Sequence, residues 1–265
     1  MSNYYKLHTL NATQSSRPVY RALRKVPEIT IFFWIVKLLT TAMGEATSDF
    51  LVFKINPYLA VTLGGIGLVL TLLLQFSVKR YIAWVYWLAV VMVAVFGTMA
   101  ADGLHIQLGV PYIVSTTFFA IVLAVVLIAW YKSEGTLSIH SINTRRREMF
   151  YWATVLATFA LGTAAGDLTA TTVGLGYFTS GLVFSALIVL PAIAYWIFGL
   201  NEILAFWVAY ILTRPIGASF ADWLSKSRSI GGLGLGDGHV SLGFSVFIIL
   251  FVVYLSISHI DVKNK

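Results

Sequence analysis

The sequence has no cysteine and few charged residues. Of its 265 residues, 58% are hydrophobic and 11% are charged, whereas a soluble domain carries about 25% charged residues. The lack of cysteine excludes disulfides, thiolate metal sites and cysteine nucleophiles. The patterns Gly-x-Ser-x-Gly and His-Glu-x-x-His are absent too, so no nucleophile constellation indicates an enzyme. The shortage of charge predicts an integral membrane protein.

Eight hydrophobic segments are each long enough to cross a bilayer, which takes about 20 residues. We therefore expect an all-α integral membrane protein with eight transmembrane helices and a single transmembrane domain over 28–259. Residues 1–27 form a polar, basic arm with no apolar stretch, so no cleavable signal peptide is expected. The predicted spans are roughly 29–52, 58–78, 81–103, 111–131, 149–168, 174–200, 203–223 and 240–258.

Lysine and arginine are distributed unequally along the chain. The arm, the even-to-odd connections and the tail (260–265) carry 13 of them, whereas the odd-to-even connections carry Lys54, Lys226 and Arg228. The positive-inside rule then puts both termini in the cytoplasm. In a membrane protein the net charge of +7 reports topology and contact with anionic lipid, so we expect the lipid bilayer and no nucleic acid as a partner.

One pattern occurs four times: an aromatic residue and Trp, then nine residues, Gly, four residues and Asp. Such an internal repeat predicts four equivalent units, each a two-helix hairpin, over approximately 29–78, 81–131, 149–200 and 203–258. Hairpins return to the side where they start, so the units share one orientation about an axis along the membrane normal. The repeated residues are Trp34, Trp87, Trp152 and Trp207; Gly44, Gly97, Gly162 and Gly217; and Asp49, Asp102, Asp167 and Asp222.

The repeated residues suggest separate roles. The Trp residues serve either as interfacial anchors or in helix packing, and the glycines allow close approach of helices. Each Asp follows its Trp by 15 residues, roughly 22 Å along a helix, so the four Asp residues should lie at one depth near the outer face. Carboxylates in a membrane are costly and usually functional or paired, and Glu45 lies on the same helix face as Asp49. The pattern predicts a cation-binding vestibule formed by Glu45 and the four Asp residues.

Five further residues are candidates for this site. His105, His239 and Asp237 lie near the outer face and are accessory ligand candidates. Lys37 either pairs with a carboxylate or extends to the inner interface. Arg214 lies three residues before Gly217, where the first unit has Thr41, and predicts a charge network or a substrate contact. The glycine-rich stretch over 225–237 predicts a flexible outer flap.

Four stretches of the sequence resemble a known family. These are KVPEITIFFWIVKLLTTAMGEATSDF, ADGLH, AAGDLTA and ADWLSKS, and the resemblance to the bacterial repeat-containing integral membrane proteins called uncharacterised membrane-anchored proteins extends over 25–257. It implies a bacterial inner-membrane setting, a multi-pass topology and a repeated hairpin fold. It supplies no catalytic residues.

The function that these patterns favour is transport of a cation by a carrier or channel. Oxygen ligands without cysteine suit a hard divalent cation, with Mn²⁺ or Mg²⁺ as the first candidates and as substrate rather than cofactor. Two alternatives stay open: a membrane scaffold in which the Asp residues are helix-end groups, and an intramembrane metalloenzyme. Homo-oligomerisation also stays open.

Overall fold

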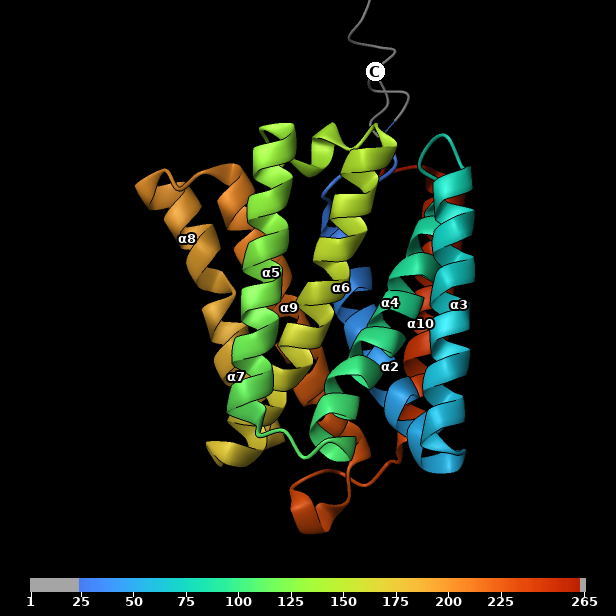
Figure 1. The fold of residues 1–265 in the computed structure, drawn as a ribbon, viewed down its shortest axis with the longest axis vertical. Helices are drawn as coiled ribbons and strands as arrows, with labels where there is room; N and C mark the ends of the chain where they lie inside the picture. Colours follow the sequence, from blue (N-terminus) through green and yellow to red (C-terminus); the bar gives the residue numbers. More distant parts are fainter. Residues whose placement is uncertain (1–23, 263–265) are drawn as a thin grey trace, which may run out of the picture.

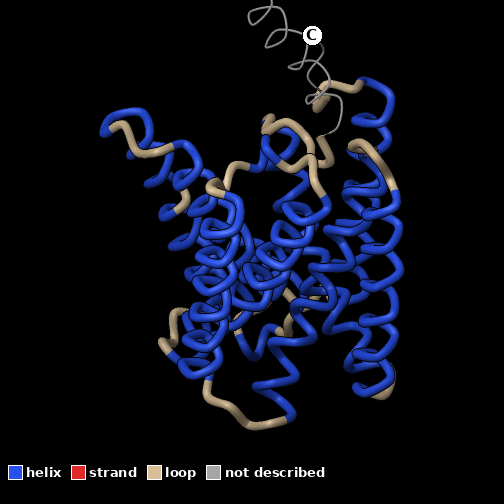
Figure 2. Tube along the Cα trace, turned by 45° about the horizontal axis from the view of Figure 1, so that its top comes forward, coloured by secondary structure: helices blue, strands red, loops and turns tan. Residues whose placement is uncertain are grey.

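The computed structural model describes residues 24–262, so most of the predicted cytoplasmic arm and residues 263–265 lie outside the described part. Within it the secondary structure is helical and no strand occurs (Figure 2). The first and last described segments lie together at one end of the bundle, where the Glu28 amide donates to the Asp261 carbonyl over 2.9 Å. We call this the terminal end.

The predicted segments all become helices, which run side by side in Figure 1. Asn56 and Asn201 cap the starts of α3 and α9 with their side chains, and Thr144 caps α6. The odd-numbered segments are α2 (Ile31–Lys54), α4 (Ala83–Asp102), α6 (Arg145–Asp167) and α9 (Glu202–Ser225); the even-numbered ones are α3 (Pro57–Ser77), α5 (Tyr112–Glu134), α7 (Tyr177–Leu187) with α8 (Val189–Phe198), and α10 (Asp237–Ser258). Short elements are the π-helices η1 (Gly103–Gln107) and η3 (Leu168–Thr172) and the 3-10 helices η2 (Ile139–Ser141) and η4 (Arg228–Ile230).

Seven helical segments in the described chain are long and apolar enough to cross a membrane. The remaining long helix, α2, has 24 residues and packs between α4, α9 and α10 within the same bundle. The hydropathy of α2 is lowered by Lys37 and Glu45, two charged residues that are buried in the interior of the bundle. The prediction of an all-α membrane protein is therefore confirmed, and seven of the eight predicted spans meet the length and composition of a membrane-crossing helix.

The four odd helices form a closed inner ring. α2 packs against α4, α4 against α6, α6 against α9, and α9 against α2. The even helices lie outside: α3 packs on α4, α5 on α6, α7 on α9 and α10 on α2. Each even helix thus packs mainly against the odd helix of the next unit. The hairpin order along the chain is as predicted, but the two helices of a unit make few contacts with each other.

The four motif glycines lie at the joints of this ring. A Cβ added to Gly97 would come within 2.8 Å of the Phe159 Cβ, and one added to Gly44 would overlap Ala94. Gly162 faces Arg214 in the same way, and Gly217 faces Thr41. In every joint, the facing residue stands three positions before the motif glycine of the next helix around the ring. One packing rule therefore generates the closed ring, and only glycine allows this close approach.

The aromatic–Trp pairs form a second closed ring near the terminal end. The first aromatic of each pair packs on the Trp of the next unit, with ring centroids 5.6–6.3 Å apart. Of the two roles open for the Trp residues, the structure shows helix packing, because three of the four are buried. The contacting pairs are Phe33–Trp87, Tyr86–Trp152, Tyr151–Trp207 and Phe206–Trp34.

The sixth predicted span, 174–200, is divided into α7 and α8 at Ile188. Pro191 lies one turn into α8 and has no N–H to donate to the preceding turn. The outer helix is therefore divided in the middle of the bundle.

Candidate functional site

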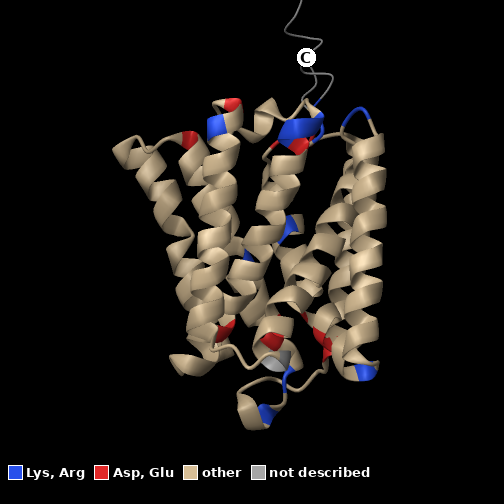
Figure 3. Ribbon diagram, viewed as in Figure 1, with Lys and Arg blue, Asp and Glu red and all other residues tan. Residues whose placement is uncertain are grey.

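The repeated aspartates lie at the end of the bundle opposite the termini. Asp102 and Asp167 are the last residues of α4 and α6, and Asp49 and Asp222 lie in the final turns of α2 and α9. Because the four helices are equivalent around the ring, their aspartates arrive at one depth. Figure 3 shows acidic residues, coloured red, on the ribbon at this end, which we call the acidic end.

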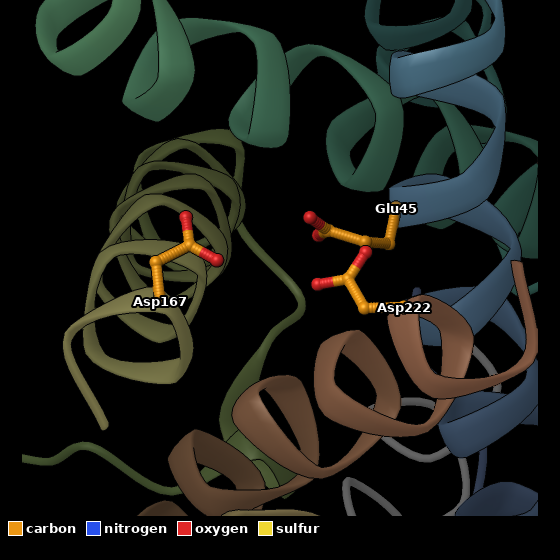
Figure 4. A group of neighbouring side chains, drawn as sticks. All are labelled: Glu45, Asp167 and Asp222. Carbon is orange, nitrogen blue, oxygen red and sulfur yellow. The ribbon is translucent and has the colours of Figure 1, made fainter. Parts of the chain in front are cut away.

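Glu45 joins the four aspartates into one cluster. Carboxylate oxygens of Glu45, Asp167 and Asp222 all lie within 4.8 Å of one another, and so do those of Glu45, Asp49 and Asp102. Figure 4 shows the first three pointing toward one another from α2, α6 and α9. Glu45 and Asp222 are 3% and 4% exposed. We call these five residues the carboxylate cluster.

Arg214 forms the inner boundary of the carboxylate cluster. Its Nη2 lies 2.5 Å from Glu45 Oε2 and 2.6 Å from Thr163 Oγ1, and it is also hydrogen-bonded to Thr98. Glu45, Thr98 and Thr163 each directly follow the motif glycine of their unit. A fully buried arginine from the fourth unit thus binds the same position in the three other units, as the predicted charge network requires.

Lys226 forms the outer boundary. It caps the C-terminus of α9, pairs directly with Asp49, and lies 3.7 Å from Asp222 and 3.6 Å from Asp237. Burial disfavours its ammonium group, but the neighbouring carboxylates outweigh burial and raise the pKa of Lys226. The side chain therefore stays cationic at neutral pH.

The loop that carries Lys226 is folded back on α9. Amides of Leu233, Leu235 and Gly236 donate to the carbonyls of Trp223, Leu224 and Ser225, at 2.7, 3.1 and 3.0 Å. Gly231, Gly234 and Gly236 have positive φ angles, which glycine adopts without strain. The predicted outer flap is thus a folded loop that satisfies the last carbonyls of α9.

The two boundary cations do not balance the cluster. Five carboxyl groups face Arg214 and Lys226, and Asp237 adds a sixth at the rim. Like charges this close cannot all stay ionised without a compensating proton or cation. The arrangement can therefore take up a metal ion and release protons as it does so.

Lys37 lies deeper in the ring and does not reach the interface. Its Nζ is 3.9 Å from the ring centroid of Phe159 and 4.3 Å from that of Tyr210, and it has no hydrogen-bond partner in the described chain. Arg214 lies over the same Phe159 ring at 5.5 Å. The structure thus places Lys37 in an aromatic cage beside Arg214, apart from the carboxylates.

The two histidines lie outside the cluster. His105 Nδ1 is 2.6 Å from the Val110 carbonyl, and its ring stacks on Tyr112. His239 Nδ1 is 3.1 Å from the Leu235 carbonyl on an exposed surface. Among described residues, neither histidine belongs to a carboxylate group that could hold a metal ion. Asp237 belongs to neither carboxylate group, and within residues 24–262 its ion pair is with Lys226.

Sequence reasoning missed the contacts of Lys226, Thr98 and Thr163. The spacing of Asp222 and Lys226 was visible, but their i,i+4 relation reads as an ordinary surface pair. The approach of Lys226 to Asp49 depends on ring closure between the first and last units. For Thr98 and Thr163 a signal existed, because the position after the motif glycine is polar in three of four units.

A family model for a repeated sequence matches this chain four times, over residues 32–81, 85–136, 150–200 and 205–261. Every match begins two residues before a motif Trp, so the matched segments coincide with the four units of the ring. The chain belongs to this repeat family. Its description is Repeat of Unknown Function (DUF347), so membership establishes the four repeats and assigns no activity. Neither the curated proteins nor the solved structures gave a match.

Proposed function

We propose that this member of the DUF347 repeat family is a membrane transporter for a cation, with the carboxylate cluster as its binding site. One observation carries the proposal: the ring places the four repeated aspartates around Glu45 in two groups that share it, and within each group the ligand atoms lie within 4.8 Å of one another. Aspartates that were only solvated groups at helix ends would not be expected to lie close together. Carboxylate oxygens suit hard cations, and a divalent ion, Mn²⁺ or Mg²⁺ first, best offsets the excess negative charge.

The setting proposed for this transporter is the inner membrane of a bacterium. The terminal end carries most of the basic residues and would face the cytoplasm by the positive-inside rule, so the cluster would open outward. A cation entering there displaces the Lys226 ammonium from Asp49 and replaces protons on the remaining carboxyl groups. Uptake is thereby linked to proton release.

A carrier fits this interior better than an open channel. Inward of the cluster the central path meets Arg214, then Lys37, then the ring of aromatic–Trp pairs. Two buried cations repel an incoming metal ion at short range, and the aromatic side chains leave no wide passage. Transport therefore requires the four units to rearrange about the ring axis.

A structural role is the second candidate, favoured by the bonds of Arg214 to three other helices. In that role the carboxylates and the two boundary cations hold the ring closed, and no ion is moved. A metalloenzyme is the weakest alternative, because the histidines that it requires lie outside both carboxylate groups.

Cation flux into proteoliposomes separates these roles. Wild-type protein should carry Mn²⁺ or Mg²⁺ and alkalinise the lumen in step with influx, because the proposed exchange moves protons out as the cation moves in. Asp102→Asn should reduce the rate at least about tenfold, because it removes one oxygen ligand and about 1.4 kcal/mol of binding is a tenfold change. Glu202→Gln, which changes an exposed carboxylate far from the cluster, is the control. Equal flux in wild type, Asp102→Asn and empty liposomes refutes transport.

Replacing Lys226 by glutamine should tighten cation binding, since the competing ammonium is removed while the carboxylates remain. We expect a Kd lower by roughly tenfold, about 1.4 kcal/mol, measured by calorimetry with the purified protein. Arg228 lies in the same loop, donates to the Leu233 carbonyl and makes no ion pair within residues 24–262. Arg228→Gln is therefore the control and should leave the Kd unchanged. Weaker binding in Lys226→Gln would show that Lys226 supports the site rather than competing for it.

A further inference from the structure

A second site lies at the terminal end, far from the carboxylate cluster. A pocket of about 560 Å³ opens between the start of α2, the break between α7 and α8, and α9. Its volume falls in the range of small-molecule sites, about 300–1,000 Å³. Figure 1 shows α8, which contributes Ala192 and Tyr195 to the lining of this pocket, at the outer edge of the bundle.

The repeat explains why the pocket exists. Trp130 follows Trp87 by 43 residues in the second unit, and Tyr195 follows Trp152 by the same 43 in the third. Trp130 is fully buried, with its ring 5.8 Å from that of Trp207. Tyr195 is 43% exposed. Among described residues, no member of α7 or α8 belongs to the buried hydrophobic core that contains Trp130 and three of the motif Trp residues.

The helix break at Ile188 accounts for this difference. Ile188 and Ala192 line the pocket at the point where α8 leaves the course of α7. In the second unit an aromatic side chain fills the corresponding place. In the third unit the space next to Trp34 is left open, and Trp34 is the only motif Trp in the described chain that is not buried. An apolar group is expected to fill such a space.

The residues that line the pocket indicate what kind of polar group an occupant would carry. Aromatic walls come from Trp34, Tyr195, Trp196 and Phe206, and carboxylates from Glu28 and Glu202. Glu28 is paired with Arg24, whereas Glu202 makes no ion pair within residues 24–262. Aromatic faces together with a carboxylate attract a cation.

We propose that this pocket binds an amphipathic cation: an ammonium or phosphonium centre that carries an apolar body. The apolar body takes the place that Trp130 occupies in the second unit. The positive centre lies between the aromatic faces and Glu202. The ligand is either a free amphipathic cation or the amine headgroup of a membrane lipid, because the chemistry of the two is shared.

Equilibrium binding of tetraphenylphosphonium to the protein in nanodiscs of phosphatidylglycerol tests this assignment. Empty nanodiscs of the same lipid correct for partition into lipid, and tetraphenylborate, which has the same shape and the opposite charge, tests whether the site selects a cation. We expect saturable binding of the phosphonium, a Kd at least fivefold higher in Glu202→Gln, and loss of binding in Ala192→Phe, which fills the pocket. Val183→Phe on the exposed surface of α7 is the matched control and should bind as the wild type does.

A second set of nanodiscs distinguishes the two sources of the ligand. If phosphatidylethanolamine raises the Kd of the phosphonium in the wild type by more than it changes partition into empty nanodiscs of the same lipids, the headgroup amine occupies the site; a Kd that is unchanged after this correction assigns the site to a free cation. The proposal is overturned if Ala192→Phe binds the phosphonium as well as the wild type does, or if saturable binding of tetraphenylborate is equally tight. Both results are independent of the carboxylate cluster and of cation transport.

Discussion

Replacing Arg214 by glutamine is expected to destabilise the protein by about 3–5 kcal/mol, the usual cost of removing one partner of a buried ion pair. The guanidinium is fully buried and binds Glu45, Thr98 and Thr163. Without it, Glu45 keeps its place among four aspartates but loses its only ion-pair partner within residues 24–262. The measurement is thermal or denaturant unfolding of the purified protein.

A double variant separates the ion pair from simple packing. Arg214→Gln with Glu45→Gln removes both charges, so we expect it to be more stable than Arg214→Gln alone, with a coupling energy of about 0.5–3 kcal/mol. Arg228→Gln controls for loss of an arginine at an exposed position. A stability loss in Arg214→Gln below about 1 kcal/mol would contradict the view that this arginine closes the cluster from the inner side.

The second large effect is expected at the joint between the last and the first unit. In Gly217→Ala the new methyl group would overlap the Thr41 side chain and come within 2.8 Å of the Ala42 amide nitrogen. Backbone cannot move aside as a flexible side chain does, so we expect a loss of about 1–3 kcal/mol or more. The ring would open between α9 and α2, which is where Arg214 meets Glu45.

Gly243→Ala is the matched control, because a Cβ at Gly243 meets nothing within 4 Å. Alanine is favoured over glycine in a helix by about 1 kcal/mol, so this variant should be neutral or more stable. Unfolding curves of the two variants in the same detergent make the comparison. If Gly217→Ala is as stable as Gly243→Ala, the motif glycines are not needed for close packing of the ring.

Much of the fold follows from one repeated pattern. The spacing of Trp, Gly and Asp predicted four units in one orientation, and the eight spans follow from hydrophobic length. The sequence period does not indicate which surface of one unit packs against the next unit. The pairing of α3 with α4, rather than with α2, is set by side-chain fit around a closed ring. The break at Ile188 had a visible signal in Pro191.

The candidate site could likewise be predicted from the sequence only in part. Equal spacing predicted that the four aspartates share one depth, but convergence required the ring to close, which places Asp222 beside Glu45. Lys226 could not be assigned because its main partner, Asp49, is 177 residues away. Lys37 was ambiguous because an aliphatic stem can extend to an interface or end in a cage, and the aromatic rings of Phe159 and Tyr210 decide the outcome.

The central claim is that the repeated aspartates form one shared cation site, and cation-dependent thermal stabilisation tests it most directly. Purified protein is melted with Mg²⁺, Ca²⁺, Mn²⁺, Zn²⁺ or Na⁺, next to Asp49→Asn, Asp167→Asn and the control Glu202→Gln. A cation at about 100 times its Kd should stabilise the folded protein by about 2.7 kcal/mol.

The account predicts a selective shift that Asp49→Asn and Asp167→Asn both abolish, although these two residues belong to different carboxylate groups. Glu202→Gln should keep the full shift. Without cation, Asp167→Asn should be at least as stable as the wild type, because one repelling charge is gone, whereas Asp49→Asn also loses the ion pair with Lys226. No shift with any cation, together with Asn variants that are merely less stable, would contradict a shared site and make the aspartates structural groups of the ring.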